Sequence, residues 1–311
     1  RYYAELYAGL PERIEDPTLL PVTDKTALMG RFDDWVTDPE VTLERVREFV
    51  ADPERAGETF LGRYLVATTS GTSGTMGLFL MGGRTMDTVL PGLVLRSLGP
   101  PLLRALPGML AGGGRSARVL ATGGHFAAYA GARALLRDKP RIGKRMRLLS
   151  VQDPLPGLVA ELEEFRPAVL ECYASTGRQL ADEAEAGRLT ISPVLVSLGG
   201  EGLPEEEYER IARVFGARIN NLYACNESPS LTSQCSQGWL HVHEDWVVLE
   251  PVEADHSPTP AGQRSRSVLL SVLYRYEQPI LRYDLGDSVV TRTDPCPVSY
   301  THLTLPTTPY V

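Results

Sequence analysis

The stretch Arg63-Tyr-Leu-Val-Ala-Thr-Thr-Ser-Gly-Thr-Ser-Gly-Thr-Met76 joins a short β-rich run to a loop of small, hydroxyl-bearing residues. Glycines let such a loop wrap closely around an anion, so that successive N–H groups and the hydroxyls of Ser70, Thr72 and Ser73 can hold phosphate oxygens. The loop is not a Walker motif, because no Gly-Lys-Ser/Thr follows it, and it lacks the Gly-x-Ser-x-Gly of a nucleophile elbow. A flexible surface loop is the alternative interpretation.

β-rich runs and helical segments alternate along the chain from this point. The runs lie at residues 63–69, 118–122, 146–151, 168–172, 194–198 and 218–223. Strands separated by helices of about ten to fifteen residues are typical of an α/β fold with largely parallel pairing.

The pattern changes after Gly238. The β-rich runs here alternate or are β-branched, and they lie at residues 240–249, 267–274 and 288–292. Such runs, joined by polar turns, predict an antiparallel β subdomain. We therefore predict an α/β core at residues 1–237 and a β-rich subdomain of the same large domain at residues 238–296.

The ends of the chain differ from this pattern. Pro21-Val-Thr-Asp-Lys25 places Thr23 or Asp24 as the cap of the helix that follows, and a second helix is predicted at residues 42–51. Residues 297–311 carry no charge and are rich in Thr and Pro. We interpret them as a non-native tail without function; a genuine Thr/Pro-rich linker is the alternative.

The composition argues against two kinds of partner. A net charge of −8 disfavours a nucleic-acid-binding surface, which needs clustered positive charge. No apolar run approaches the ~20 residues of a membrane-spanning helix. Four cysteines in 311 residues do not form a disulfide framework, so we expect a reducing compartment and a cytoplasmic protein.

Two further clusters place polar residues where predicted strands end. They are Leu198-Gly-Gly-Glu-Gly-Leu203 and Asn221-Leu-Tyr-Ala-Cys-Asn-Glu227. Ligands of α/β sheets bind beyond the carboxyl ends of the strands. Tyr223 could stack on a purine, and Glu227 could hold Mg²⁺ against phosphates, because Mg²⁺ prefers carboxylate and phosphate oxygens. A core tyrosine and a surface glutamate are the alternative.

A fourth cluster is Leu281-Arg-Tyr-Asp-Leu-Gly-Asp287. The Asp287 carboxylate offers two oxygens and could accept hydrogen bonds from both hydroxyls of a ribose. The same residue types also favour a β-turn, which is the alternative interpretation.

In this order and spacing, the four clusters resemble the adenylate-forming superfamily, and within it the phenylacetate–CoA ligase and coenzyme F390 synthetase-like branch. Two further matches are Leu20-Pro-Val-Thr-Asp-Lys25 and Gly238-Trp-Leu-His-Val-His-Glu-Asp245. The resemblance covers residues 1–296. It implies the large N-terminal domain of such an enzyme, with mostly parallel βα sheets followed by an antiparallel subdomain.

The resemblance implies roles for individual residues. Thr72 and Glu227 would take part in catalysis, with Glu227 reaching Mg²⁺, and His125 and Phe126 would wall the acyl pocket. Gly200 and Glu201 would line the adenine, Tyr223 would stack on it, Asn226 would lie near the phosphates and Asp287 would hold the ribose. The implied phosphate loop consists of Ser70, Gly71, Thr72, Ser73 and Gly74.

Two places depart from the family's pattern. Met76 and Gly77 stand where many members carry Pro and Lys, so a lysine contact to phosphate from this loop is absent. Asn226 stands where Thr or Ser is usual, and its amide could still donate to phosphate. Neither change removes the implied site.

The resemblance also implies a reaction. The substrate carboxylate attacks the α-phosphorus of ATP, pyrophosphate leaves, and the acyl-AMP is then transferred, most often to CoA. Positioning, Mg²⁺ and loop N–H groups would supply the rate. An aryl or arylacetic acid is the expected small-molecule partner, and a homodimer is a further expectation. The family's C-terminal lid is not found in this chain, which starts at Arg1, so we expect a truncated fragment with impaired adenylation.

The resemblance implies a structural zinc site as well, because some relatives carry one in this region. Cys235 and His241 are close in sequence, and Cys296 begins what resembles a Cys-Pro-Cys-Gly knuckle. Cysteine and histidine side chains suit a tetrahedral Zn²⁺, although a fourth ligand is absent. Unligated cysteines and a packed histidine are the alternative.

Three other interpretations remain. The acyl-AMP could pass to an amine or a carrier protein instead of CoA. The chain could be a non-catalytic nucleotide-binding accessory domain, although intact Glu227 and Asp287 argue against a dead site. A zinc-bearing structural module would bind metal without ATP. Nucleotide-dependent thermal stabilisation separates the first two from the third, and turnover separates the first from the second.

Overall fold

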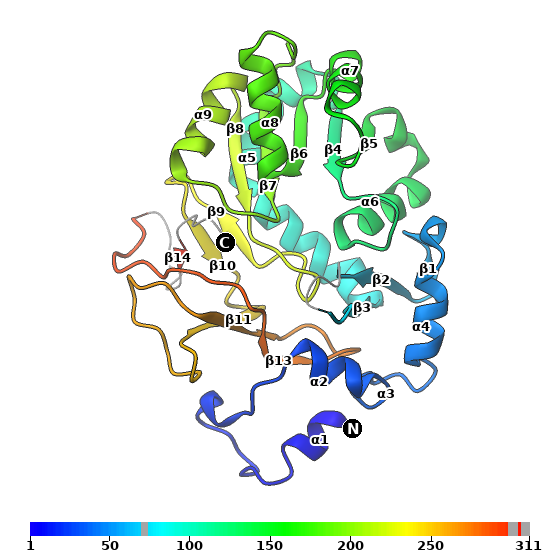
Figure 1. Cartoon of the computed structure of the whole chain (residues 1–311), viewed down its shortest axis with the longest axis vertical. Coiled ribbons are helices and arrows are strands. Elements are labelled where there is room, and N and C mark those ends of the chain that lie inside the picture. Colours follow the sequence, from blue (N-terminus) through cyan, green and yellow to red (C-terminus); the bar gives the residue numbers. More distant parts are fainter. Residues whose placement is uncertain (70–73, 298–303, 306–311) are drawn as a thin grey trace.

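The computed structural model describes residues 1–69, 74–297 and 304–305, without the side chains of residues 98–102, 304 and 305. Two halves meet across the middle of the molecule (Figure 1), one built on a parallel sheet and the other on antiparallel sheets. The α/β class predicted from the sequence is confirmed.

The first half is built on a five-stranded parallel sheet with the strand order β5-β4-β6-β7-β8. The strands are β4 (Ser116–Leu120), β5 (Met146–Ser150), β6 (Val169–Tyr173), β7 (Leu195–Gly199) and β8 (Arg218–Leu222). Each lies within two residues of a β-rich run of the sequence. The prediction of repeated, parallel βα units is confirmed for this part of the chain.

Helices connect successive strands of this sheet and pack on it. They are α6 (Ala127–Asp138), η4 (Pro140–Lys144), α7 (Leu155–Phe165), α8 (Ala174–Glu185) and α9 (Glu205–Phe215). In Figure 1, α8 and α9 lie in front of the sheet and the long helix α5 (Leu90–Ala111) lies behind it. Side chains such as Leu162, Leu170 and Ile211 form one buried cluster between helices and strands. This core fixes the strand ends that lead into the candidate site.

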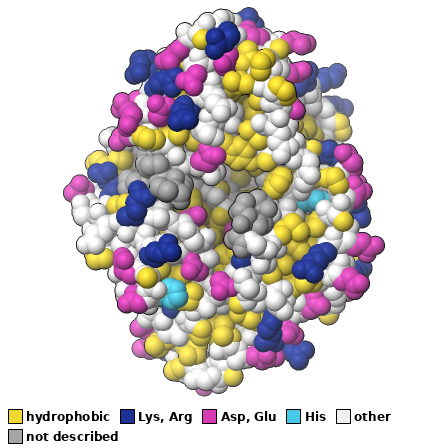
Figure 2. Space-filling view, in the orientation of Figure 1, with side chains coloured by type: hydrophobic (Ala, Val, Ile, Leu, Met, Phe, Trp, Pro, Cys, Tyr) yellow, Lys and Arg dark blue, Asp and Glu magenta, His cyan; other side chains and the backbone are white. Residues whose placement is uncertain are grey.

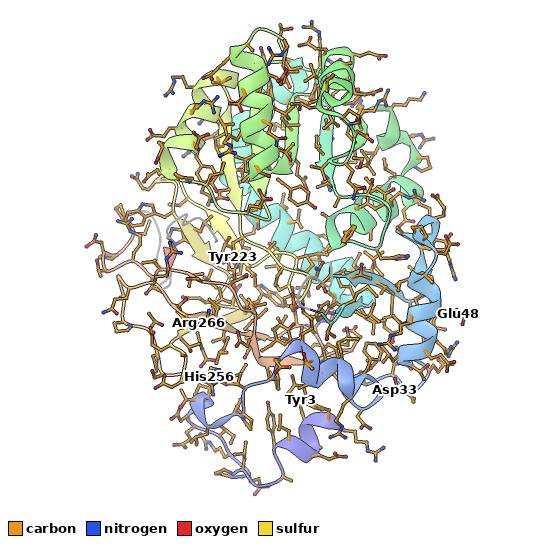
Figure 3. The ribbon with its side chains drawn as sticks, in the orientation of Figure 1. Tyr3, Asp33, Glu48, Tyr223, His256 and Arg266 are labelled. Carbon is orange, nitrogen blue, oxygen red and sulfur yellow. The ribbon has the colours of Figure 1, made fainter. Side chains whose placement is uncertain are left out.

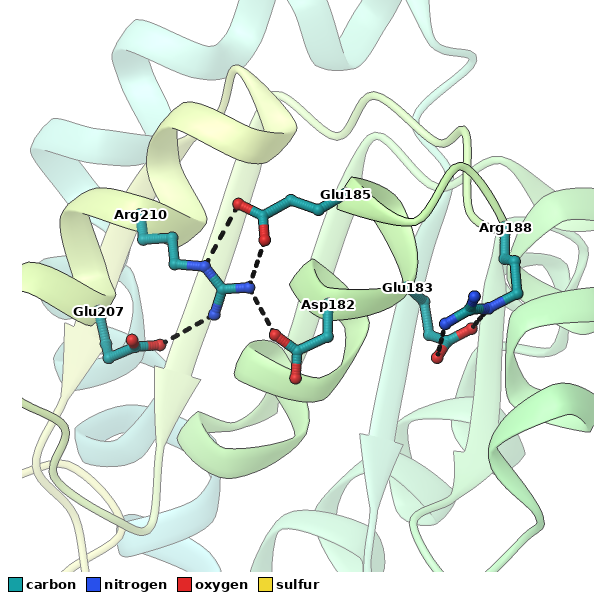
Figure 4. A network of polar contacts seen from close by, with 6 residues as sticks. All are labelled: Asp182, Glu183, Glu185, Arg188, Glu207 and Arg210. Atoms are coloured by element: carbon teal, nitrogen blue, oxygen red, sulfur yellow. Dashed lines mark hydrogen bonds and ion pairs between the residues drawn. The ribbon is translucent and has the colours of Figure 1, made fainter.

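Ion pairs join α8 to α9 on the outer surface of this half (Figure 4). The Arg210 guanidinium of α9 lies 2.6 Å from a Glu185 oxygen and 3.2 Å from a Glu207 oxygen, and it also pairs with Asp182. Surface ion pairs of this kind contribute little to stability individually. Acidic and basic side chains are likewise mixed over the face in Figure 2, without a large area of one sign.

The strands on either side of the predicted phosphate loop lie in a different, antiparallel sheet. Its strands are β1 (Thr59–Phe60), β2 (Tyr64–Thr68) and β3 (Leu78–Met81), in that order. β2 and β3 pair antiparallel, with Thr68 opposite Leu78. The assignment of residues 63–69 to the repeated parallel pattern is therefore wrong. A parallel neighbour would need a long crossover, whereas β3 returns after a short loop.

The C-terminal part is antiparallel, as predicted. One sheet has the order β11 (Val247–Val252), β12 (Ser267–Val272), β13 (Ile280–Asp284), and another has the order β14 (Thr304–Leu305), β10 (Leu240–Val242), β9 (Thr232–Gln234). Two predicted runs need correction. Residues 240–249 are split by a turn between β10 and β11, and residues 288–292 have only an isolated bridge, from Val290 to Arg264. The strand lies at β13 instead, where a full ladder with β12 is available.

Short helices form most of the N-terminal segment and its links to β1 and α5. They are α1 (Tyr2–Leu6), η1 (Pro17–Leu19), α2 (Lys25–Gly30), α3 (Phe32–Trp35), α4 (Leu43–Val50), η2 (Pro53–Arg55) and η3 (Thr85–Val89). Asp24 is the cap of α2, since its carboxylate accepts from the Ala27 amide at 2.7 Å. Thr23 instead attaches this segment to β13, because its amide donates to the Arg282 carbonyl at 3.0 Å.

A second hydrophobic cluster joins these helices, the β2–β3 hairpin and the C-terminal sheets. Phe32, Phe79, Tyr274 and Tyr283 are among its most deeply buried side chains. The cluster draws on both sides of the predicted division at 237/238, and that division stays a prediction. Among the helices within the described ranges, none is both long and apolar enough to cross a membrane.

Candidate nucleotide site

The candidate site lies where the parallel sheet meets the antiparallel half. Tyr223 comes directly after β8, and Asp287 follows β13 by three residues. The Tyr223 hydroxyl donates to Oδ2 of Asp287 at 2.8 Å, which joins the two halves through one hydrogen bond. Figure 3 shows Tyr223 in the middle of the molecule, between the two sets of sheets. The structure thus brings together two residues that are 64 positions apart in sequence.

Asp287 lies in an electrostatically unfavourable place for a carboxylate. Burial raises its pKa above the usual range, and the nearby charges of Glu227 and Asp284 act in the same direction. The hydrogen bond from Tyr223 opposes this shift. A carboxylate kept in such a place at a cost is typical of functional sites.

Glu227 is 5% exposed and lies in the loop after β8. Burial raises the pKa of Tyr283, and the neighbouring Glu227 carboxylate acts in the same direction. The Glu227 backbone carbonyl accepts from the Arg275 guanidinium at 2.7 Å. Within the described ranges, no ion pair involves the Glu227 carboxylate. The alternative of a surface glutamate is therefore wrong, because the side chain is buried. The alternative of a core tyrosine agrees with the structure, because Tyr223 is 7% exposed and belongs to a hydrophobic core cluster.

The end of β7 brings Gly200 and Glu201 near the same junction. Gly200 has a φ of +75°, and a Cβ there would lie 2.8 Å from the Tyr173 ring, so only glycine fits without a shift. The Glu201 carboxylate accepts from the Ser175 amide at 2.9 Å, in the first turn of α8. Asn226 is half-buried beside Glu227, and its carbonyl accepts from Arg275 at 3.2 Å.

Most of the predicted phosphate loop, Ser70, Gly71, Thr72 and Ser73, lies outside the described residues. The residues on either side of it, Thr69 and Gly77, are joined by two hydrogen bonds. The Thr69 amide donates to the Gly77 carbonyl at 3.1 Å, and the Gly77 amide donates to Thr69 Oγ1 at 2.8 Å.

The geometry of the loop's second flank explains one departure from the family pattern. Gly74 has a φ of +93°, which favours glycine. A Cβ at Gly77 would lie 2.7 Å from the Phe79 ring, so a lysine does not fit at that position without rearrangement.

His125 and Phe126 follow β4, at the edge of the same junction. The His125 carbonyl accepts from the Thr68 amide at 2.7 Å, which attaches the end of β2 to the residues after β4. The imidazole is buried, with Nε2 3.0 Å from the Asp52 carbonyl oxygen and the ring beside Phe49. Burial lowers the His125 pKa. A role of His125 and the half-buried Phe126 in the acyl pocket stays a prediction.

The candidate zinc ligands converge in space. Side-chain ligand atoms of Cys235, His241 and Cys296 all lie within 4.8 Å of one another, and the two Sγ atoms are 3.8 Å apart. Cys235 follows β9 and His241 lies in β10, so a hairpin supplies two of the three.

Two buried residues near the site were missed by the sequence reasoning. Arg275 is 3% exposed and Gln278 is fully buried, in the connection between β12 and β13. Their run, Tyr-Arg-Tyr-Glu-Gln-Pro, has the composition of an exposed turn. Only the packing of β3 against this connection shows that the side chains point inward.

Comparisons with known proteins agree with this arrangement. No protein-family model matches the chain. Over 153 residues the chain is 28% identical to the phenylacetate-coenzyme A ligase of Thermus thermophilus, a match that covers 46% of this chain and 34% of that ligase. The matched stretch thus spans about a third of that relative.

Solved structures of 2-hydroxyisobutyryl-CoA ligase share the fold. The open conformation in complex with 2-HIB-AMP and CoA has a TM-score of 0.66 at 19% identity, covering 98% of this chain and 69% of that one. The thioesterification state gives a TM-score of 0.67 at 20% identity, covering 98% and 62%. Sequence and fold together confirm the resemblance: the chain carries the fold of the adenylate-forming enzymes and is similar in sequence to their phenylacetate–CoA ligase branch.

Proposed function

We propose that the chain binds ATP and activates a carboxylic acid as an acyl-AMP. The observation that carries the proposal is the junction of Tyr223, Asp287 and Glu227, because an aromatic side chain and two buried or half-buried carboxylates lie together there. The similarity to a phenylacetate-coenzyme A ligase supports the same reaction class.

Each residue has a separate task in this proposal. Asp287 accepts hydrogen bonds from the ribose, and Tyr223, held by Asp287, offers its ring to the base beside the bare backbone of Gly200. The N–H groups of residues 70–74 hold phosphate oxygens, with the Thr72 hydroxyl and the Asn226 amide adding donors. The acid enters as a carboxylate, so attack at the α-phosphorus needs orientation and charge stabilisation more than proton transfer.

The residues present fit a Mg²⁺ ion that accompanies the nucleotide. Glu227 is a buried carboxylate, and a buried charge is costly unless a cation or donors compensate it. Carboxylate and phosphate oxygens are the ligands that Mg²⁺ prefers. When bound, the ion would neutralise charge on the phosphates. Glu227 would hold it on the protein side.

The acid and the acyl acceptor are finer parts of the proposal. We propose an aryl or arylacetic acid and transfer to CoA, supported by the match to a phenylacetate-coenzyme A ligase. Transfer to an amine or carrier protein is the alternative. Cys172 and Cys225 are free thiols in the described part of the chain, which suits a reducing compartment and a cytoplasmic site of action.

Calorimetric titration with N-acylsulfamoyl adenosines, stable analogues of acyl-AMP, tests the proposal. We expect the phenylacetyl or benzoyl analogue to bind more tightly than both AMP and the 2-hydroxyisobutyryl analogue. Equal affinity for all analogues and AMP would leave a nucleotide site without an acyl pocket. Absence of binding by any of them would contradict the proposal.

We also propose a structural Zn²⁺ held by Cys235, His241 and Cys296. Two thiolates on a tetrahedral Zn²⁺, with Zn–S bonds of about 2.3 Å, lie about 3.8 Å apart. The Sγ atoms of Cys235 and Cys296 are 3.8 Å apart, well beyond the length of a disulfide bond. The third ligand lies within reach on β10. The ion would tie the β9–β10 hairpin to the segment after β13.

We expect the purified chain to contain about one zinc per molecule by elemental analysis, because three converging ligands bind tightly. Cys235→Ser should lose the metal and lower the thermal midpoint. Cys172→Ser, a buried cysteine in β6, is the matched control and should retain the metal. A metal-free protein with a Cys235–Cys296 disulfide in the peptide map would show that the proposal is wrong.

A homodimer through α5 is the last part of the proposal. Leu95, Leu103 and Leu110 lie on one face of this helix and are 65%, 70% and 70% exposed. Apolar patches of a few hundred Å² mark interaction sites. Two copies of this face would bury on the order of 1,000 Å², the lower end for a specific interface. The partner that we propose for these leucines is the same helix of a second copy.

Sedimentation equilibrium checks the dimer. We expect twice the 34.1 kDa chain mass at micromolar concentration, and the single-chain mass for Leu103→Glu. Leu273→Glu, at a leucine that is 47% exposed elsewhere, should leave the dimer intact. A wild-type monomer at this concentration would refute the interface.

A further inference from the structure

We propose that Arg275 and Gln278 form a clamp that sets the position of Glu227 relative to β3, the strand that follows the predicted phosphate loop. The clamp consists of these two side chains and the backbone groups to which they are hydrogen-bonded. It rests on the proposed function, because it assigns both residues as positioning residues for Mg²⁺-bound ATP.

The Arg275 guanidinium reaches two segments that are far apart in sequence. Its Nη1 donates to the Glu227 carbonyl at 2.7 Å and to the Asn226 carbonyl at 3.2 Å. Its Nη2 donates to the Leu80 carbonyl of β3 at 2.6 Å. One rigid, planar group therefore fixes the distance between the Glu227 loop and the strand that leaves the phosphate loop.

Gln278 completes the attachment to β3. Its Oε1 accepts from the Leu80 amide at 2.6 Å, and its Nε2 donates to the Leu78 carbonyl at 3.0 Å. Oε1 also accepts from the Arg275 guanidinium at 3.3 Å. The amide thus pairs with β3 as a neighbouring strand would, and it orients Arg275 at the same time.

Stability alone is a poor explanation for Arg275. Burial lowers its pKa, which shows that the charged form is costly in this place. Among the ion pairs of the described residues, none involves Arg275; carbonyl oxygens accept its hydrogen bonds, and the nearby charges of Glu227 and Glu277 favour its protonated form. Apolar replacements of buried charges are often neutral or stabilising. A planar fork that joins two segments is better explained by the need to hold their geometry.

This placement predicts different effects on two ligands. Mg²⁺-bound ATP needs the phosphate loop and Glu227 in register, because both contact the polyphosphate end. AMP lacks the β- and γ-phosphates and is held mainly by Asp287, Tyr223 and Gly200, whereas the clamp is hydrogen-bonded to the Glu227 loop and to β3. Loosening the clamp should therefore weaken binding of Mg²⁺–ATP much more than binding of AMP.

The test is calorimetric titration of Arg275→Met and Arg275→Lys with Mg²⁺–ATP and with AMP, alongside the thermal midpoint. For Arg275→Met we expect Mg²⁺–ATP affinity to fall by about tenfold or more and AMP affinity to change by less than about twofold. Arg275→Lys keeps the positive charge but loses the planar guanidinium with its paired donors. Its affinity for Mg²⁺–ATP should therefore lie between those of Arg275→Met and the wild type. If Arg275→Met does not fold, Gln278→Met carries the test, with a smaller loss in the same direction.

Arg282→Met is the matched control. Arg282 is also a buried arginine, 5% exposed, but its guanidinium donates to the Thr18 and Leu20 carbonyls, away from the phosphate loop. We expect it to lower the thermal midpoint while changing both affinities by the same factor. An Arg275→Met profile equal to that of Arg282→Met would overturn the clamp and leave the proposed function standing. Wild-type protein that binds neither nucleotide would overturn the proposed function itself.

Discussion

Replacing Glu227 with glutamine is expected to lower carboxylate-dependent ATP–pyrophosphate exchange by about a hundredfold or more. The change keeps the size of the side chain and removes the charge that we assign to Mg²⁺. Loss of one preorganised electrostatic contact to a developing charge typically costs a factor of 10²–10³ in rate. The loss should show in kcat and in the Mg²⁺ concentration needed for half-maximal exchange, while AMP affinity stays within about twofold of wild type.

Glu171→Gln is the control for this variant. Glu171 lies in β6 and pairs with Arg118 at 3.1 Å. The substitution therefore removes a carboxylate from the same half of the molecule without changing the candidate site. Its exchange rate should equal that of the wild type. Exchange by Glu227→Gln within about twofold of wild type would mean that another group holds the ion.

Asp287→Asn is expected to weaken nucleotide binding and to stabilise the protein. Asparagine keeps one oxygen for the Tyr223 hydroxyl but replaces the other acceptor with a donor, so a ribose hydroxyl loses its partner. Hydrogen bonds to charged groups contribute about 1.5–3 kcal/mol, so AMP affinity should fall at least about tenfold. Calorimetry on AMP, with adenine as a ligand that lacks the ribose, measures the effect. Equal losses for AMP and adenine would contradict the ribose role.

The stability effect of the same variant follows from the direction of the pKa shift. Burial raises the pKa of Asp287 in the folded state, so the folded protein holds a proton that the unfolded chain releases near its ordinary pKa. The contribution of Asp287 to the free energy of unfolding therefore falls as the pH rises from about 3.9 through the raised pKa. At pH 7 the ionised carboxylate destabilises the fold. Asp287→Asn should raise the thermal midpoint at pH 7 and lose that advantage below about pH 4. A lower midpoint at pH 7 would contradict the assignment.

Local sequence patterns predicted the parallel strands and the helix cap, because both features depend mainly on neighbouring residues. The parallel strands were found because β-rich runs alternate with amphipathic helices, and the α2 cap because Asp24 stands directly before the helix. The antiparallel pairing of β2 with β3 was missed. A strand followed by a glycine-rich loop has the same sequence pattern in a parallel βα unit and in an antiparallel pair. Residues 288–292 have strand composition but only an isolated bridge, and sequence alone does not show which neighbour is available.

The candidate site divides in the same way. Motif residues such as Tyr223 and Asp287 were identified by order and spacing, whereas the hydrogen bond between them depends on how two sheets meet. The inward positions of Arg275 and Gln278 had no sequence signal, because a charged residue in a short connection is normally exposed. Their role depends on β3, which is about 200 residues away in sequence.

The proposed acid activation is tested by carboxylate-dependent ATP–pyrophosphate exchange over a panel of aryl, arylacetic and short hydroxy acids. We expect exchange with at least one aryl or arylacetic acid, dependent on Mg²⁺ and abolished by Glu227→Gln. Thermal stabilisation by ATP without exchange for any acid would contradict it, and would leave a nucleotide-binding domain that has the fold of a ligase without its chemistry.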